Sequence, residues 1–258
     1  MRALRTLALM LAVALSACAT TAADDVDSAW RPGYLWQSVA GHLRMLAAAR
    51  SVDEVLADPG TPDDLRQRLE LSRTLRDYAS QHLALPDNAS YRRYADLGRP
   101  AAVWNVVAAP ELSLKLKTWC FPVLGCVGYR GYFDKAEAEM LASALRAQGW
   151  EANVYGVPAY STLGKLPGDW FADPLLNTFL RHGEVELARL VFHELAHQVA
   201  YAADDTPFNE SYATAVERLG SRQWLQQRGR ADLIAETERA DRRRAEFRAM
   251  TMAARERL

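Results

Sequence analysis

The stretch Leu187-Ala188-Arg189-Leu190-Val191-Phe192-His193-Glu194-Leu195-Ala196-His197 decides how the rest of this 258-residue chain is interpreted. Its apolar residues and strong helix formers predict an α-helix. Residues four apart lie on one face of a helix, so the imidazoles of His193 and His197 can bind the same metal ion, with Glu194 beside them as a general base. This HExxH pattern predicts a zinc site, although a histidine pair on an amphipathic helix can also be packed and hydrogen-bonded without a metal.

A catalytic zinc site needs a third ligand, and Glu210 is the best candidate in the sequence. Asp205-Thr206-Pro207 is typical of a helix start, with Thr206 as the N-cap and Pro207 at the first helical position. Glu210 then falls about one turn into a second helix. A short turn would make the two helices antiparallel and bring Glu210 level with His197. Two histidines and one glutamate leave a coordination position open, which favours catalysis over a structural site.

Glu217 lies seven residues beyond Glu210, and therefore on the same face of the second helix, about two turns further along. Histidines that bind a metal commonly donate their free ring N–H to a carboxylate, which fixes the ring. Glu217 could accept such a bond from His193, or it could be an outward-facing surface residue. The sequence leaves both interpretations open.

The segment Asn209-Glu210-Ser211-Tyr212-Ala213, together with HExxH, resembles the gluzincin pattern, in which the zinc-binding glutamate lies in an NExxA-type helix. Only residues 198–209 separate His197 from Glu210, a shorter spacing than in the thermolysin-like enzymes. The chain is more similar to a family of bacterial lipoproteins known as putative aminopeptidases, over nearly the whole length that follows the leader. Besides the two metal-site motifs, this similarity rests on Leu85-Pro86-Asp87-Asn88-Ala89-Ser90-Tyr91, Ala108-Ala109-Pro110-Glu111, residues 120–132 and Ala159-Tyr160-Ser161-Thr162-Leu163-Gly164.

The resemblance implies metal-assisted hydrolysis of a peptide substrate, in which zinc polarises a carbonyl and Glu194 takes a proton from water. Tyr160 is the residue that we expect to stabilise the oxyanion, although a single tyrosine more often serves core packing. We expect residues 157–163 to form an edge strand that binds an extended peptide. The sequence has no GxMEN exopeptidase motif, so exopeptidase, endopeptidase and cell-wall peptide amidase activity all stay open.

The chain opens with a pattern typical of a bacterial export signal. Residues 1–17 carry two arginines followed by an apolar run that is too short to span a bilayer. Leu15-Ser16-Ala17-Cys18 resembles the lipobox, in which the cysteine becomes the lipid-bearing first residue; an ordinary secretory peptide is the alternative. We expect residues 18–29 to be a lipidated tether that anchors the protein on the periplasmic face of the bacterial envelope. No acidic residue follows Cys18 directly, which points to the outer membrane.

The two cysteines that remain after Cys18 are Cys120 and Cys126. Pro122 and Gly125 would help a turn to bring their thiols together, and the periplasm permits disulfides. Zinc sites built on cysteine usually show a closer spacing and a second ligand pair, so a metal role is disfavoured. We therefore expect a disulfide between Cys120 and Cys126.

Composition favours one domain over residues 30–258 and disfavours nucleic acid as a partner. Half of the residues are hydrophobic, and the formal net charge is −1. The run Arg242-Arg243-Arg244 lies among acidic residues on an expected C-terminal helix, which indicates a solvated face. We expect contact with the membrane through the lipid anchor only.

The coarse pattern of the chain predicts an α+β fold. Residues 34–49 and 62–83 have helical periodicity, and we expect them to pair as an antiparallel hairpin. Residues 101–133 are typical of two or three strands. Asp134 caps an expected helix that runs to residue 148 and is followed by a strand at 151–157. The strands should form a small mixed sheet between helical segments.

Two classes of function are compatible with these observations. The first is a zinc peptidase with Glu194 as its general base. The second is a non-catalytic, zinc-stabilised envelope lipoprotein that acts as a binding or scaffold module. Glu194 separates them, because only the peptidase needs its carboxylate.

Overall fold

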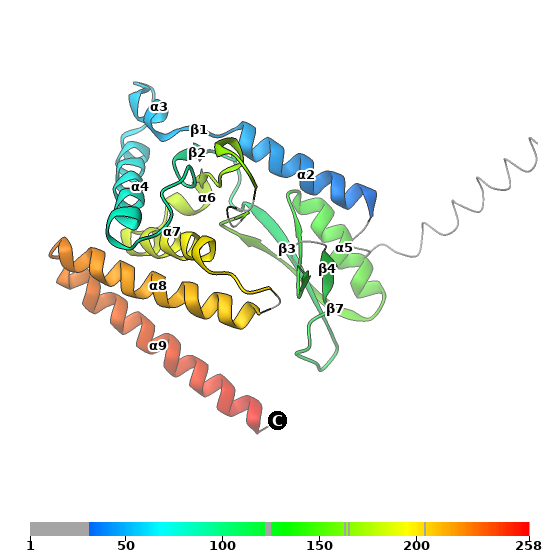
Figure 1. The fold of residues 1–258 in the computed structure, drawn as a ribbon. Coiled ribbons are helices and arrows are strands. Elements are labelled where there is room, and N and C mark those ends of the chain that lie inside the picture. The colour runs from blue at the N-terminus through cyan, green and yellow to red at the C-terminus, as the bar shows by residue number, and fades with distance from the viewer. Residues whose placement is uncertain (1–30, 122–124, 163, 165, 204, 258) are drawn as a thin grey trace, which may run out of the picture. The chain divides into compact units, whose positions relative to one another are not determined.

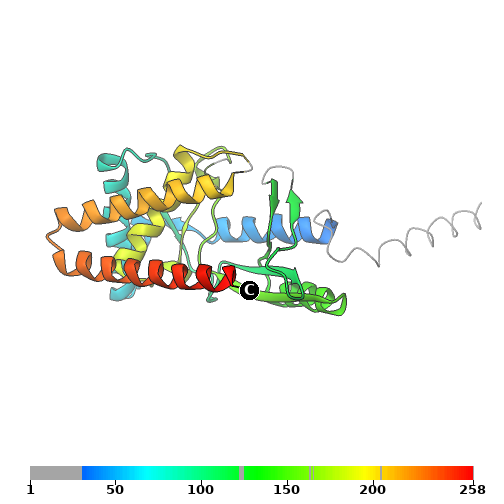
Figure 2. The same ribbon diagram turned by 90° about the horizontal axis from the view of Figure 1, so that it is seen from below.

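Figures 1 and 2 show the computed structural model of the protein, which describes residues 31–121, 125–162, 164, 166–203 and 205–257. These residues form two compact units. The first combines residues 31–44 with Val103–Val157, and the second combines Met45–Ala102 with the chain from Pro158 onward. The expected export signal, Cys18 and tether lie outside the described residues, and the single domain over 30–258 stays a prediction.

The first unit is built on an antiparallel sheet with the strand order β6-β3-β7. β3 (Val103–Pro110) pairs along its whole length with β7 (Trp150–Val157), and its first half pairs with β6 (Arg130–Tyr132). α5 (Lys135–Ala147) packs on this sheet. The core of the unit consists of Val106, Ala108, Trp119, Tyr132, Ala138, Leu141, Ala142 and Leu145.

The ends of α5 follow from its sequence. The carboxylate of Asp134 accepts hydrogen bonds from the backbone N–H groups of Ala136 at 2.7 Å and Glu137 at 3.1 Å, which caps the helix. Gly149 has a φ of 86°, a left-handed conformation that glycine adopts without strain, and it ends the helix before β7. The expected helix and the strand that follows it are therefore confirmed.

Two further elements complete the first unit. β4 (Trp119–Phe121) and β5 (Gly125–Val127) form an antiparallel pair in which Cys120 lies opposite Cys126, and the expected disulfide joins them. α2 (Pro32–Ala47), whose last residues are counted with the second unit, is held by Gln37, which accepts a hydrogen bond from Phe133 N at 3.1 Å.

The second unit carries a small mixed sheet with the strand order β1-β2-β8. β1 (Arg50–Ser51) runs antiparallel to β2 (Arg93–Ala95), which runs parallel to β8 (Leu175–Leu176). The helices of this unit are α3 (Val52–Ala57), α4 (Asp63–His82), the 3-10 turn η1 (Asp169–Phe171), α6 (Asn177–Leu180), α7 (Glu184–Val199), α8 (Thr206–Gln227) and α9 (Ala231–Glu256).

α7 is the central helix of the second unit and packs against both α4 and α8. Its apolar side chains Phe192 and Leu195 are fully buried. Tyr78 of α4 lies with its ring centroid 6.1 Å from that of Phe192 and 5.0 Å from that of Trp224 on α8. A helix that is packed on several sides has little freedom to rotate, so the core fixes the direction of the polar residues on its remaining face.

α8 and α9 follow as two long antiparallel helices (Figure 1). Asp241 on α9 accepts two hydrogen bonds from the guanidinium of Arg189 on α7, at 3.0 and 2.7 Å, which ties α9 to the central helix. The residues directly after it, Arg242, Arg243 and Arg244, are exposed, as the interpretation of a solvated face predicts.

The α+β class is confirmed, with two differences in detail. The strands form three small sheets rather than one, because the chain distributes them over two units. The helices expected to pair as an N-terminal hairpin, α2 and α4, fall in different units, and α4 packs instead against α3 and α7. Among the described residues, no helix has the length and apolar character needed to cross a bilayer.

Candidate metal centre

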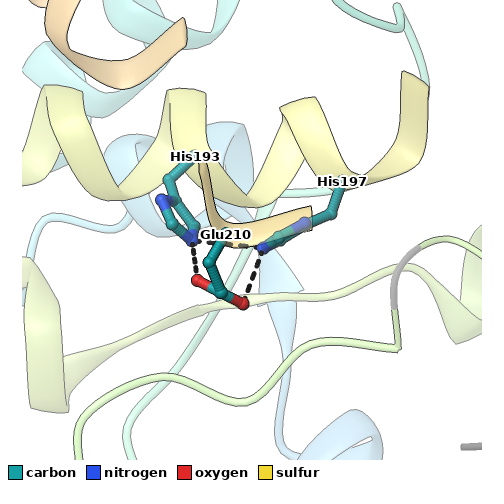
Figure 3. A group of neighbouring side chains, drawn as sticks. All are labelled: His193, His197 and Glu210. Carbon is teal, nitrogen blue, oxygen red and sulfur yellow. Dashed lines mark hydrogen bonds and ion pairs between the residues drawn. The ribbon is translucent and has the colours of Figure 1, made fainter. Parts of the chain in front are cut away.

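Three side chains from α7 and α8 converge on one point (Figure 3). Nε2 of His193 lies 3.3 Å from Oε2 of Glu210, and Nε2 of His197 lies 3.6 Å from Oε1 of the same carboxylate. The two Nε2 atoms are 3.1 Å apart. The potential ligand atoms all lie within 4.8 Å of one another, so the structure brings together the three residues that the motifs select.

The start of α8 places Glu210 beside the histidines. The carboxylate of Asp205 accepts a hydrogen bond from Phe208 N at 3.0 Å and caps the helix, so the N-cap is Asp205 and not Thr206. Pro207 then lies in the first turn, where its missing N–H has no cost. The error of one residue in the cap leaves Glu210 about one turn into the helix, opposite the last turns of α7.

Asn209 closes the turn between α7 and α8. Its side-chain oxygen accepts a hydrogen bond from Ala202 N at 2.7 Å, and its Nδ2 donates to Ala202 O at 2.8 Å. The Asn209 residue is only 2% exposed. This two-way bond fixes the path of the turn, and therefore the height of the neighbouring Glu210 relative to His197.

The donor set fits a divalent cation. Two imidazole nitrogens and a carboxylate are ligands that zinc prefers, and three protein ligands with an open position are typical of catalytic zinc sites. The lone pairs of two neutral imidazoles repel each other, so Nε2 atoms at 3.1 Å need either a proton or a cation between them. The geometry of His193, His197 and Glu210 thus fits a metal ion, although it does not identify which one.

The pKa directions show that the cluster favours a positive charge. Burial acts to lower the pKa of His193, but hydrogen bonds to Glu210 and Glu217 outweigh it and raise this pKa to about 10. Burial lowers the pKa of His197, and the charge on His193 lowers it further. The hydrogen bond from His193 lowers the pKa of Glu210. Without a metal, one proton on His193 provides the charge that a cation would otherwise bring.

Glu217 contacts the other nitrogen of the same imidazole. Its Oε2 lies 2.9 Å from Nδ1 of His193, and about four-fifths of its side chain is buried, since 20% of it is exposed. The contact therefore excludes the outward-facing alternative, while its role toward a metal stays a prediction. His197 differs, because its Nδ1 is buried and has no hydrogen-bond partner among the described residues.

Glu194 titrates near neutrality in this environment. Burial raises the pKa of its carboxyl to about 7; His193 and a hydrogen bond from Ser161 oppose the shift, and the charges of Asp173 and Glu210 add to it. A carboxyl group with such a pKa can both take up and release a proton near pH 7.

A polar cluster lies beside Glu194 and includes Ser161, in the segment before η1. The sequence motifs assign no role to this cluster. Ser161 donates to Asp173 at 2.9 Å, and its side chain lowers the pKa of the Glu194 carboxyl and that of the Tyr91 hydroxyl. Tyr91 and Ser161 both occur in the segments that carry the family resemblance, although no role had been given to either. No sequence pattern marked Asp173, because its contacts are with residues distant in the chain.

The expected edge strand at 157–163 is not formed where the structure describes this segment. β7 ends at Val157, and residues 158–162 have no strand structure. Pro158 has no N–H to donate to a neighbouring strand. The N–H of Thr162 donates to the carboxylate of Asp173, at 2.9 and 3.0 Å to its two oxygens, instead of pairing with a strand. Tyr160 is partly buried in this segment, and its role in stabilising an oxyanion stays a prediction.

A second network holds the end of α7. The side chain of Gln198, next to His197, accepts from Asn88 Nδ2 at 2.7 Å and donates to Ser90 Oγ at 3.2 Å. The loop that carries these two residues is fixed by the fully buried Arg76, which donates to Ser90 O at 2.9 Å and to Asn88 O at 2.9 Å. These contacts fix the part of α7 that presents His197.

Comparison with known proteins gives one match. A family model described as "putative aminopeptidase" matches residues 33–258, which includes every residue of the metal centre. No curated protein and no solved structure matches this chain.

Proposed function

Because the chain belongs to the putative aminopeptidase family, we propose that it is a zinc-dependent peptidase whose metal ligands are His193, His197 and Glu210. The observation that carries this proposal is the convergence of three potential ligand atoms within 4.8 Å, from α7 and α8, with Glu194 next to His193 on α7. Zinc, when bound, supplies Lewis acidity that polarises a peptide carbonyl and lowers the pKa of water.

Glu194 is the general base of the proposed reaction. Its carboxylate accepts a proton from the attacking water and returns it to the leaving amine, and a pKa of about 7 suits both steps. Glu217 holds the His193 ring through Nδ1, which leaves Nε2 of that ring free to bind the metal. Tyr160 is proposed as the oxyanion stabiliser.

The location of the protein is proposed from its first residues. Lipidation of Cys18 would anchor the chain to the periplasmic face of the bacterial envelope, at the outer membrane. The disulfide between Cys120 and Cys126 supports an oxidising compartment. Labelling of growing cells with a radioactive fatty acid tests this, since Cys18→Ser should abolish incorporation into the protein.

A digest of a defined peptide mixture tests the activity. The zinc-loaded protein is incubated with pairs of peptides that differ only in a free or an acetylated amino terminus, and the products are identified by mass spectrometry. Cleavage of the free member alone indicates an aminopeptidase, and cleavage of both indicates an endopeptidase. Failure of the zinc-loaded protein to cleave any peptide or muropeptide would contradict the proposed function.

The variant Glu194→Gln separates the peptidase from the scaffold alternative. It should keep zinc content within about twofold of the wild type and lower the rate of hydrolysis by about 10²- to 10⁴-fold, because only the base is lost. Glu151→Gln, on the sheet of the first unit, is the matched control and should leave the rate unchanged. A scaffold would instead keep its cellular role with glutamine at position 194.

A further inference from the structure

Asp173 lies buried beside the candidate metal centre, between η1 and β8. The residue is only 1% exposed. Its carboxylate accepts hydrogen bonds from Ser161 Oγ at 2.9 Å, from Thr162 Oγ1 at 2.9 Å, and from Thr162 N at 2.9 and 3.0 Å to its two oxygens. Its backbone carbonyl accepts from Tyr91 N at 2.7 Å. Asp173 thus holds together two segments that are distant from each other in the sequence, one at Tyr91 and one at residues 161–162.

The carboxylate of Asp173 is buried and is held by hydrogen bonds from Ser161 and Thr162. Burial raises the pKa of its carboxyl, and the interactions that oppose the shift all come from Ser161 and Thr162. No lysine or arginine is among the groups of the described chain that shift this pKa. Burying a carboxylate is costly, and the hydrogen bonds from Ser161 and Thr162 compensate for that cost only while both residues hold their places.

Ser161 connects Asp173 with Glu194, the proposed general base. Its Oγ lies 2.9 Å from Oδ2 of Asp173, to which the hydroxyl donates. The side chain of Ser161 also acts on two neighbouring groups, since it lowers the pKa of the Glu194 carboxyl and that of the Tyr91 hydroxyl. The bond to Asp173 therefore holds in place a hydroxyl group that acts on the carboxyl of Glu194.

We propose that Asp173 is a positioning residue of the peptidase site, which accepts hydrogen bonds from Ser161 and Thr162 and so holds Ser161 beside Glu194. This inference rests on the proposed function. It assigns residues 160–162 to the lining of the reaction site. It attributes their position to hydrogen bonds with the Asp173 carboxylate rather than to strand pairing. Small displacements of groups around a reacting centre have large effects on rate, so the anchor should act on kcat.

The variant Asp173→Asn tests the proposal. Asparagine has nearly the same shape but offers one acceptor oxygen, and its NH2 group opposes the donors of Thr162. The expected result is a fall in kcat of about 10- to 100-fold on the peptide that the wild type cleaves fastest, with KM within about threefold and zinc content unchanged. Amide hydrogen exchange of residues 159–162 should become faster, while exchange in α7 stays the same.

Two further variants control for general destabilisation. Asp134→Asn changes an aspartate that also accepts backbone N–H groups, but in the first unit, and it should leave kcat unchanged. Thr162→Val keeps the size of the side chain and removes one of the donors to Asp173, so it should give a smaller fall in kcat. If Asp173→Asn does not fold, Thr162→Val decides the question by the same measurements.

The outcomes separate this inference from the proposed function. An unchanged kcat in Asp173→Asn, or a fall that follows zinc loss or the unfolded fraction, would overturn the positioning role while leaving the peptidase intact. If the wild type cleaves no peptide, the proposed function fails first. Hydrogen exchange then decides whether Asp173 anchors the segment, and unchanged protection of residues 159–162 in Asp173→Asn would overturn the anchor as well.

Discussion

The imidazole of His193 lies between two carboxylates of α8: Oε2 of Glu217 is 2.9 Å from its Nδ1, and Oε2 of Glu210 is 3.3 Å from its Nε2. The two glutamates are seven residues apart and therefore lie on one face of that helix. Each contacts a different ring nitrogen, so we propose different roles for them. In the proposed site Glu210 shares a metal ion with the ring, and Glu217 orients it.

The first prediction concerns Glu210. Replacement by alanine removes one of the three proposed ligands, and zinc affinity should fall by at least about 100-fold, more than the loss of an orienting partner produces. Titration with a chromophoric zinc chelator measures the affinity. Glu151→Ala, in the first unit, serves as the control. Unchanged affinity in Glu210→Ala would show that this carboxylate is not a ligand.

The second prediction concerns Glu217. Replacement by glutamine keeps the size of the side chain but removes the charge that accepts the Nδ1 proton of His193. Zinc affinity should fall by about 10- to 100-fold, as is usual for the loss of a residue that orients a metal-bound histidine. The same chelator titration measures it. An affinity equal to that of the wild type would leave the Glu217 contact with no role in metal binding.

The third prediction concerns the metal-free protein at different pH. Because the folded-state pKa of His193 is raised from 6.5 to about 10, protonation of this ring stabilises the folded state, and the full contribution is present below pH 6.5. It is lost as the pH rises toward 10. Chemical denaturation in the presence of a chelator should therefore show a falling free energy of unfolding over this range.

The variant His193→Gln provides the control for that pH dependence. It lacks the titrating ring, so its free energy of unfolding should change less between neutral pH and pH 10 than that of the wild type. Zinc should reverse the trend in the wild type, since the metal binds the deprotonated ring and gains affinity as the proton leaves. Parallel pH profiles for His193→Gln and the metal-free wild type would contradict the raised pKa.

The fourth prediction concerns Asn209. Replacement by alanine leaves the N–H and C=O groups of Ala202 without their partners, which should cost about 1 to 3 kcal/mol of stability. The turn between α7 and α8 should also loosen, so zinc affinity should fall together with stability. Asn153→Ala, at an exposed position of β7, should change neither quantity. Thermal unfolding with and without zinc measures both effects.

Local sequence was sufficient for several parts of this structure. The cap at Asp134 and the left-handed Gly149 set the limits of α5, and a proline in the first turn of α8 placed Glu210 about one helical turn after its start. The spacing of Cys120 and Cys126 allowed the disulfide that the structure contains. These features depend on hydrogen bonds and geometry within a few residues, which a sequence pattern can represent directly.

The two predictions of local structure that differ from the observed fold, an edge strand and a helical hairpin, fail for the same physical reason. The edge strand at 157–163 was inferred from position alone, whereas Asp173 draws Thr162 N–H away from any strand. The pairing of α2 with α4 was inferred from adjacency in the sequence, although the chain places them in different units. In both cases contacts with other parts of the chain decide the outcome, and a local sequence pattern does not report them.

The sequence by itself determined which residues could meet at the candidate metal centre. His193 and His197 are four residues apart and therefore share a face of α7, and Glu210 lies about one turn into α8. Only the tertiary structure decided what surrounds that chemistry. Burial of Glu194, the contact of Glu217 with His193, and the anchoring of Ser161 by Asp173 all join segments distant in the chain. Such contacts depend on how the core packs, which is a property of the whole fold rather than of any stretch of residues.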